Sequence, residues 1–374
     1  MNPRIASMYS IRCFAIVGAK VRKKVVTLGC FSRKYYLCGM KERINWIDWA
    51  KALTACGIVF IHVPQSQEWF YFRFLQACVL TVFLWVSGYL KKDYGSDKAN
   101  WRKYWHSLIL PYLLYNAIVY PYWLVRYYML NGGMPDLLHA LRPVFGALLL
   151  EHENAFCEPL NGPLWYLPAI LLMHITIDLC RKTRHQHVIM IALCCLAMVL
   201  YAANKKWYFA PDLTPMGFLR GLPFYYLGYV MGTKGTVPNV PIPTAFVLLA
   251  LSLLFFHWHL QLYYAGEHWL HIALFYPVNL CFLFSVIYAC KLLDGIRLKG
   301  ITNLSIGTLV IIGLFYPLIT IVNFALEHLL PIDGGICYHW YEAIPVTLLI
   351  VALLYPAIRF AQRHAPMLIG RKKS

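Results

Sequence analysis

Apolar residues run through the chain in long stretches that short polar loops separate. Ten of these stretches approach or reach the roughly 20 residues that a helix needs to cross a hydrocarbon core about 30 Å thick. They lie at about 46–63, 69–90, 106–128, 163–180, 187–203, 216–233, 243–259, 270–292, 304–326 and 343–361. The pattern predicts an all-α membrane protein, a bundle of about ten transmembrane helices.

Three segments lie outside these spans. Residues 137–150 are too short and too interrupted to span, and we expect an interfacial or re-entrant helix there. Residues 1–40 are basic and only briefly apolar, which predicts a disordered tail or a gene start placed too early. The chain therefore divides into this tail, a transmembrane domain at 41–365 and a basic cytoplasmic tail at 366–374.

Composition agrees with this class, because 60% of the residues are hydrophobic, only 13% are charged, and the mean hydropathy is +0.55. The net charge of +18 does not indicate nucleic acid. With a cytoplasmic N-terminus and ten spans, most Lys and Arg fall in cytoplasmic loops and most acids in the opposite loops. This is the positive-inside asymmetry, and it places both termini in the cytoplasm.

The first span carries three ionisable side chains on one stripe. Lys51 and His62 lie about three helical turns apart, within roughly 20° of the same face and about 16 Å apart along the axis. Asp48 precedes Lys51 on nearly the same stripe. Because charges at membrane depth cost about 3 kcal/mol or more, such a stripe predicts a polar interior. His62 could act as a general base, or bond to a neighbouring helix. Lys51 could meet an anionic group or pair with Asp48.

The second span ends in Ser87-Gly88, a small pair that lets a backbone or a thin ligand approach closely. A serine nucleophile would need an adjacent base, and nothing local supplies one. The basic side chains that follow are explained by topology or bind the phosphates of coenzyme A. They are Lys91, Lys92, Lys98, Arg102, Lys103 and His106.

Three further positions concern an acceptor. The segment from Asn161 to Trp165 and Tyr166 forms either an aromatic belt at the membrane interface or a pocket whose rings stack on a sugar. Arg220 is an intramembrane charge and requires a partner. Glu153 lies in the long loop at 129–162, where it could position an acceptor or simply be solvated.

Four motifs follow one another along the chain. They are Lys51-x(10)-His62, Val82-Phe-Leu-Trp-Val-Ser87-Gly88-Tyr89-Leu90, Gly162-Pro-Leu-Trp165-Tyr166-Leu167, and Arg220 followed by an aromatic run to Gly228-Tyr229. Together they resemble acyltransferase family 3, membrane O-acyltransferases of surface polysaccharides, over about 41–365. An Arg-x-x-Arg element that the family often carries before its third helix is only approximated by Arg102, Lys103 and His106.

The resemblance implies an enzyme of the bacterial inner membrane that moves an acyl group from cytoplasmic acyl-CoA to a glycan hydroxyl. Acetyl-CoA is the commonest donor and succinyl the alternative; the acceptor is an envelope glycan or a lipid-linked saccharide, and no metal is expected. Direct transfer and an acyl-histidine relay are both compatible. No hydrolase-like domain is appended, which suggests a stand-alone transferase.

The implied roles fall into three groups. The catalytic residues are His62, Lys51 and Asp48; the coenzyme contacts are Arg102, Lys103, His106, Lys91, Lys92, Ser87 and Gly88; the acceptor contacts are Trp165, Tyr166, Asn161, Arg220 and Glu153. The alternative is a transporter of lipid-linked saccharide or small anions that uses the polar stripe as a conduction path.

Overall fold

The computed structural model describes residues 43–371, apart from 67, 152, 155, 209–212, 236 and 330–334. Residues from Asn45 onward form one compact unit, to which all the helices below belong. The N-terminal tail expected at 1–40 lies outside the described residues, as do residues 372–374 of the C-terminal tail.

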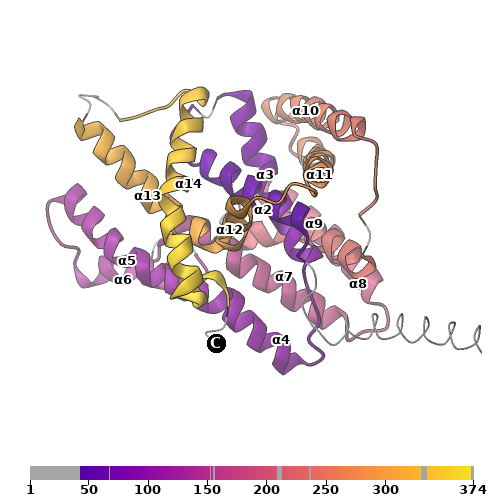
Figure 1. The fold of residues 1–374 in the computed structure, drawn as a ribbon, viewed down its shortest axis with the longest axis horizontal. Coiled ribbons are helices and arrows are strands. Elements are labelled where there is room, and N and C mark those ends of the chain that lie inside the picture. The colour runs from indigo at the N-terminus through magenta and orange to yellow at the C-terminus, as the bar shows by residue number, and fades with distance from the viewer. Residues whose placement is uncertain are drawn as a thin grey trace, which may run out of the picture. The chain divides into compact units, whose positions relative to one another are not determined.

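Within its described part this unit consists of helices joined by short loops (Figure 1). In chain order they are α2 (Asn45–Phe60), α3 (Phe70–Tyr89), α4 (Asp97–Tyr104), the π-helical turn η1 (Trp105–Ile109), α5 (Leu110–Asn131), α6 (Leu137–Leu148), the 3₁₀ turn η2 (Gly162–Trp165), α7 (Tyr166–Cys180), α8 (Gln186–Trp207), α9 (Thr214–Lys234), α10 (Pro243–Tyr264), α11 (His268–Leu292), α12 (Lys299–Ile306), α13 (Thr308–Leu329), α14 (Trp340–Arg363) and the 3₁₀ turn η3 (Pro366–Ile369).

Eight helices of the described chain are long and apolar enough to cross a membrane. They are α3, the continuous helix from α4 through η1 to α5, η2 with α7, α8, α10, α11, α13 and α14. The predicted all-α membrane protein is confirmed, and the count of about ten is approximate. The two expected spans outside this set are α2, which has only 16 residues, and α9, which carries Arg220 and is less apolar.

Both of these helices pack against several others. α2 contacts α3, α11, α12, α13 and α14, and α9 contacts α3, α7 and α8 (Figure 1). Of the 16 residues of α2, ten are buried. A helix that other helices surround can carry ionisable groups, because those groups face protein cavities instead of lipid. The two expected spans outside the set of eight are thus the helices that carry Asp48 with Lys51 and Arg220.

Glycines bring α3 and α9 into close backbone contact. A Cβ atom on Gly88 would lie 2.0 Å from the carbonyl oxygen of Tyr225, and one on Gly228 would lie 2.1 Å from that of Trp85. Small residues allow such approaches between membrane helices. Gly88 thus has the close backbone approach that the small pair allows, and the contact fixes the end of α3 that holds Ser87.

The short segment predicted at 137–150 is α6, a helix of 12 residues, too short to span. Asp136 caps its N-terminus, since the carboxylate accepts a hydrogen bond from the backbone N–H of His139 at 2.8 Å. The hydroxyl of Tyr120 donates to the carbonyl of Ala140 at 2.9 Å, which ties α6 to α5.

Candidate active site

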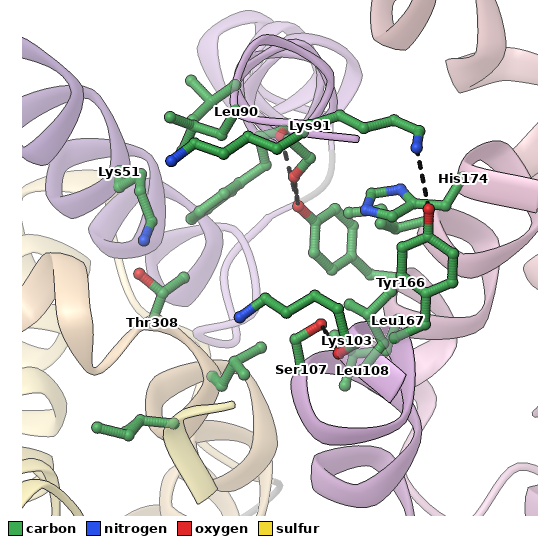
Figure 2. Close-up of a pocket in the computed structure, with 18 of the residues that line it drawn as sticks. Lys51, Leu90, Lys91, Lys103, Ser107, Leu108, Tyr166, Leu167, His174 and Thr308 are labelled. Atoms are coloured by element: carbon green, nitrogen blue, oxygen red, sulfur yellow. Dashed lines mark hydrogen bonds between the residues drawn. The ribbon is translucent and has the colours of Figure 1, made fainter. Parts of the chain in front are cut away.

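Four lysines line one cavity of about 260 Å³, which we call the lysine cavity. Lys51 comes from α2, Lys91 and Lys92 directly follow α3, and Lys103 comes from α4. Figure 2 shows the ammonium groups of Lys51 and Lys103 directed into the same space from opposite walls, whereas Lys91 turns towards His174. The cavity therefore gathers residues from distant parts of the chain into a basic site.

Lys51 and Asp48 both bind Ser305 of α12. The Lys51 ammonium donates to the carbonyl oxygen of Ser305 at 2.7 Å, and the hydroxyl of Ser305 donates to the Asp48 carboxylate at 2.6 Å. Asp48 is buried, while Lys51 is partly exposed and lines the lysine cavity. Asp48 thus holds Ser305 in place, and Ser305 in turn positions the ammonium group of Lys51.

Lys91 belongs to a buried network that sequence reasoning missed. Its ammonium donates to Asp178 at 2.6 Å and to the hydroxyl of Tyr104 at 2.9 Å, and Tyr104 donates to the other oxygen of Asp178. Burial lowers the pKa of Lys91, while the Asp178 carboxylate opposes that shift. Because Asp178 balances this charge, Lys92 and Lys103 are the lysines that leave the cavity positive.

His62 lines a second cavity of about 390 Å³, which we call the histidine cavity. Its Nδ1 lies 2.8 Å from the carbonyl oxygen of Ile58. A carbonyl can only accept, so Nδ1 carries the proton, and in the neutral ring Nε2 keeps its lone pair. Phe315 packs edge-on at 4.9 Å between ring centroids and holds the imidazole in place. The side chain has the tautomer that a general base requires.

Tyr166 lines both cavities. Its side chain is buried, and its hydroxyl lies 2.9 Å from that of Ser87. Ser87 lines the lysine cavity, where Figure 2 shows the Tyr166 side chain in the wall, and Tyr166 also lines the histidine cavity. Tyr166 is the side chain that the described linings of the two cavities have in common.

Trp165 and Arg220 line the histidine cavity as well. The Arg220 guanidinium lies over the Trp165 indole, 6.0 Å from the ring centroid. Gly217, one turn before Arg220, has no room for a Cβ because that atom would lie 1.9 Å from the Trp165 ring. The third and fourth motifs thus meet at one wall of this cavity.

The remaining expected site residues lie elsewhere. Arg102 is exposed and His106 half-buried, and neither lines the lysine cavity. Gly88 packs against α9. Asn161 is buried, with its amide donating to the carbonyl of Gly313 at 2.8 Å. Glu153 is exposed in its loop and lines neither cavity.

Glu151, two residues before Glu153, is fully buried instead. Its Oε2 accepts from the backbone N–H of Asn161 at 3.3 Å, whereas its Oε1 and the Oδ1 of Asn116 have no hydrogen-bond partner within the described structure. Burial raises the pKa of Glu151 to about 7. A buried carboxyl is more stable in its neutral, protonated form, because burial removes the water that would solvate the charge. Leu150 and Glu151 both have a left-handed backbone, with φ of 63° and 60°, which turns the carboxyl inward.

Fold and site define a multi-pass helical membrane protein whose two polar cavities meet at one tyrosine. The family model of the acyltransferase domain, acyltransferase family 3, matches residues 44–358, most of the chain. The chain belongs to this family, and the resemblance seen in four motifs is confirmed. It is therefore an acyltransferase that transfers groups other than amino-acyl groups. No curated protein and no solved structure matches the chain.

Proposed function

We propose that this acyltransferase moves an acyl group from acyl-CoA, with acetyl-CoA as the preferred donor, to a hydroxyl of an envelope glycan or lipid-linked saccharide. The observation that carries the proposal is the pair of cavities that share Tyr166, one lined by lysines and the other by His62. Such an arrangement gives a donor and an acceptor separate entrances to one reaction centre.

The chemistry of the lysine cavity supports a donor that bears phosphates. Lys103 has Lys92 and Arg371 as its charged neighbours, and both repel it. Clustered like charges are costly unless an anion offsets them. The phosphates of coenzyme A would lie at this cluster, and the pantetheine arm would enter past Lys51 towards Tyr166.

The histidine cavity supports attack by a hydroxyl. The acceptor oxygen attacks the thioester carbonyl carbon while Nε2 of His62 takes the hydroxyl proton. The new C–O bond forms, the C–S bond breaks, and the leaving thiolate receives the proton from His62. The ester and the free thiol of coenzyme A are the products, and the base returns to its neutral tautomer.

Membership of an acyltransferase family favours this reaction over transport by the same polar path. The proposal is tested with purified protein in lipid nanodiscs, by following thiol release from acetyl-CoA with and without an oligosaccharide acceptor. We expect release to depend on the acceptor and an equal amount of ester to appear on it. Uptake of saccharide into vesicles with no consumption of acetyl-CoA would show a transporter instead.

A further inference from the structure

A third cavity, of about 800 Å³, adjoins the histidine cavity. Gln76 and Arg220 line both spaces, so the two cavities adjoin at these side chains. We call it the arginine–tyrosine cavity. α3, α8, α9, α10 and α11 form its walls.

Arg220 has an unusual environment for a charge at membrane depth. Within the described structure its guanidinium makes no hydrogen bond and no ion pair, and its contact is the Trp165 ring at 6.0 Å. The guanidinium carries five donors arranged to match a carboxylate or phosphate. An intramembrane charge requires a counter-charge, so a ligand that enters from either cavity is the group that would supply it.

The rest of the arginine–tyrosine cavity fits the same ligand. Arg73 and Lys205 add two cations, and His259 and His271 add two imidazoles. No Asp or Glu occurs among the cavity-lining residues that the structure describes. The four tyrosines in the lining are Tyr201, Tyr208, Tyr263 and Tyr264. Aromatic faces stack on sugar rings, and cations bind acidic groups.

Several of these side chains are held in place before any ligand arrives. The Arg73 guanidinium donates to the hydroxyl of Tyr264 at 2.5 Å and lies 5.5 Å from the centroid of that ring. Nδ1 of His259 donates to the carbonyl of His271 at 2.6 Å, which leaves its Nε2 available to the cavity ligand. Fixed polar groups bind with a smaller loss of conformational entropy.

We propose that the arginine–tyrosine cavity binds an anionic saccharide, with its acidic group on Arg220 and its neighbouring sugar rings against the tyrosines. The acidic group is a carboxylate or a phosphate carried by the saccharide. The inference rests on the proposed function and deepens it, because it assigns the chemical class of the acceptor whose hydroxyl approaches His62 from the side of Gln76 and Arg220.

The test compares three tetrasaccharides that share one backbone and differ in their acidic groups: a neutral galactose tetramer, the corresponding galacturonate tetramer with a carboxylate in place of each CH2OH, and the neutral tetramer carrying one phosphate. Binding is measured without acyl-CoA, on the full chain in nanodiscs of zwitterionic lipid. We expect at least one charged probe to bind about tenfold more tightly than the neutral one, since charge-assisted hydrogen bonds from arginine contribute a factor of this size. The charged probe with the higher affinity shows whether the cavity prefers a carboxylate or a phosphate.

Arg220→Gln should abolish the preference, and Arg220→Lys should keep part of it. Lys234→Gln removes one positive charge from the exposed end of the same helix and should keep all of it. Equal affinities for the three probes in the wild type, or no measurable binding of any, would overturn the inference even if the Arg220 variants did not fold. So would a preference that survives Arg220→Gln.

Thiol release from acetyl-CoA is measured on the same preparations. Wild-type protein that transfers acyl groups but shows no preference for a charged probe contradicts the saccharide assignment alone. Protein that prefers the charged probe but never consumes acetyl-CoA with any tetramer contradicts the transferase proposal alone.

Discussion

The hydrogen bond between Nδ1 of His62 and the carbonyl of Ile58 selects the ring nitrogen that can act as a base. The bond is local, because the carbonyl belongs to the residue four positions earlier. His328 makes the same bond to the carbonyl of Phe324, also at 2.8 Å, on an exposed surface. The two histidines therefore differ in their surroundings rather than in their backbone geometry.

His62→Ala should lower acyl transfer at least about 100-fold, since a positioned acid–base group contributes at least that much. Acceptor-dependent thiol release measures it. His328→Ala is the matched control and should keep near wild-type activity. More than a tenth of the wild-type rate in His62→Ala would remove His62 from the mechanism.

Lys51 and Asp48 give a second prediction at this scale. In the double variant Asp48→Lys with Lys51→Asp, a carboxylate would replace the ammonium group at the carbonyl oxygen of Ser305. Both groups are hydrogen-bond acceptors, so the hydrogen bond would be lost. The exchanged pair should therefore be inactive, whereas Lys51→Arg should be tolerated much better than Lys51→Met. Thiol release across these variants checks the order. Near-normal activity in the exchanged pair would mean that the two residues act only as an ion pair.

At the scale of the element, the loop between α6 and η2 joins three helices through Glu151 and its neighbours. Asn161, whose backbone N–H binds Glu151, bonds to α13 through Gly313. Thr214, at the start of α9, donates to the carbonyl of Leu150 at 2.5 Å. The loop thus holds the Trp165–Tyr166 segment in its position between the cavities.

Glu151 makes the stability of this loop depend on pH. Its pKa in the folded protein is about 7, raised by burial from an ordinary 4.5. Between these values the folded chain keeps a proton that the unfolded chain releases, so the free energy of unfolding falls as the pH rises through this window. It levels off above pH 7, after a loss of roughly 3 kcal/mol.

Melting temperatures in detergent between pH 5 and pH 8 measure this fall. Glu151→Gln should flatten the curve, because a glutamine keeps the shape and cannot ionise. Glu153→Gln changes an exposed carboxyl two residues away and should leave the slope unchanged. A slope that is the same in all three proteins would show that Glu151 is ionised throughout the range.

At the scale of the whole molecule, the loops that flank the lysine cavity are basic and are joined by ion pairs. Arg181 binds Asp93, and Lys182 binds Asp97 at 2.6 Å, which ties the loop after α3 to the turn after α7. At the end of the molecule that holds His62, the segment after α2 is joined to the segment before α14 by a backbone hydrogen bond. The N–H of Tyr338 donates to the carbonyl of Pro64 at 2.8 Å.

The charge asymmetry predicts that the lysine-cavity end faces the cytoplasm. In a background without other cysteines, Cys337, which is exposed beside Tyr338, should react with an impermeant maleimide added to intact cells. Lys98→Cys, on exposed α4, should react only after permeabilisation. The reverse pattern would invert the membrane orientation and place the donor site on the outer face.

The sequence by itself determined the class of the protein and the segment that carries Asp48, Lys51 and His62. Span length and charge asymmetry are properties of neighbouring residues, so they can be predicted without knowledge of the packing. The helical period placed Lys51 and His62 on one stripe of one helix, whereas α2 ends at Phe60: His62 lies in the turn beyond it and lines a different cavity from Lys51. The Ser87-Gly88 approach was also predictable, because glycine has no side chain to keep α9 away.

Only the tertiary structure decided which of the similar residues form the site. The sequence proposed Arg102, Lys103 and His106 alike, but of these three only Lys103 lines the cavity. Nothing in the sequence distinguished Glu151 from Glu153; in the structure Glu151 has a left-handed backbone and is fully buried, whereas Glu153 is exposed.

The same holds for every contact between distant segments. His174 of α7 lines the lysine cavity, Asp178 of the same helix binds Lys91, and Arg371, just after η3, lies near Lys103. Tyr166 lines both cavities, to which α2, α3 and α13 also contribute. Such proximity depends on how helices cross, and a crossing is set by the summed packing of whole helix faces. No single position in the sequence determines how two helices cross. The spans were therefore predictable, and the shape of the site between them was not.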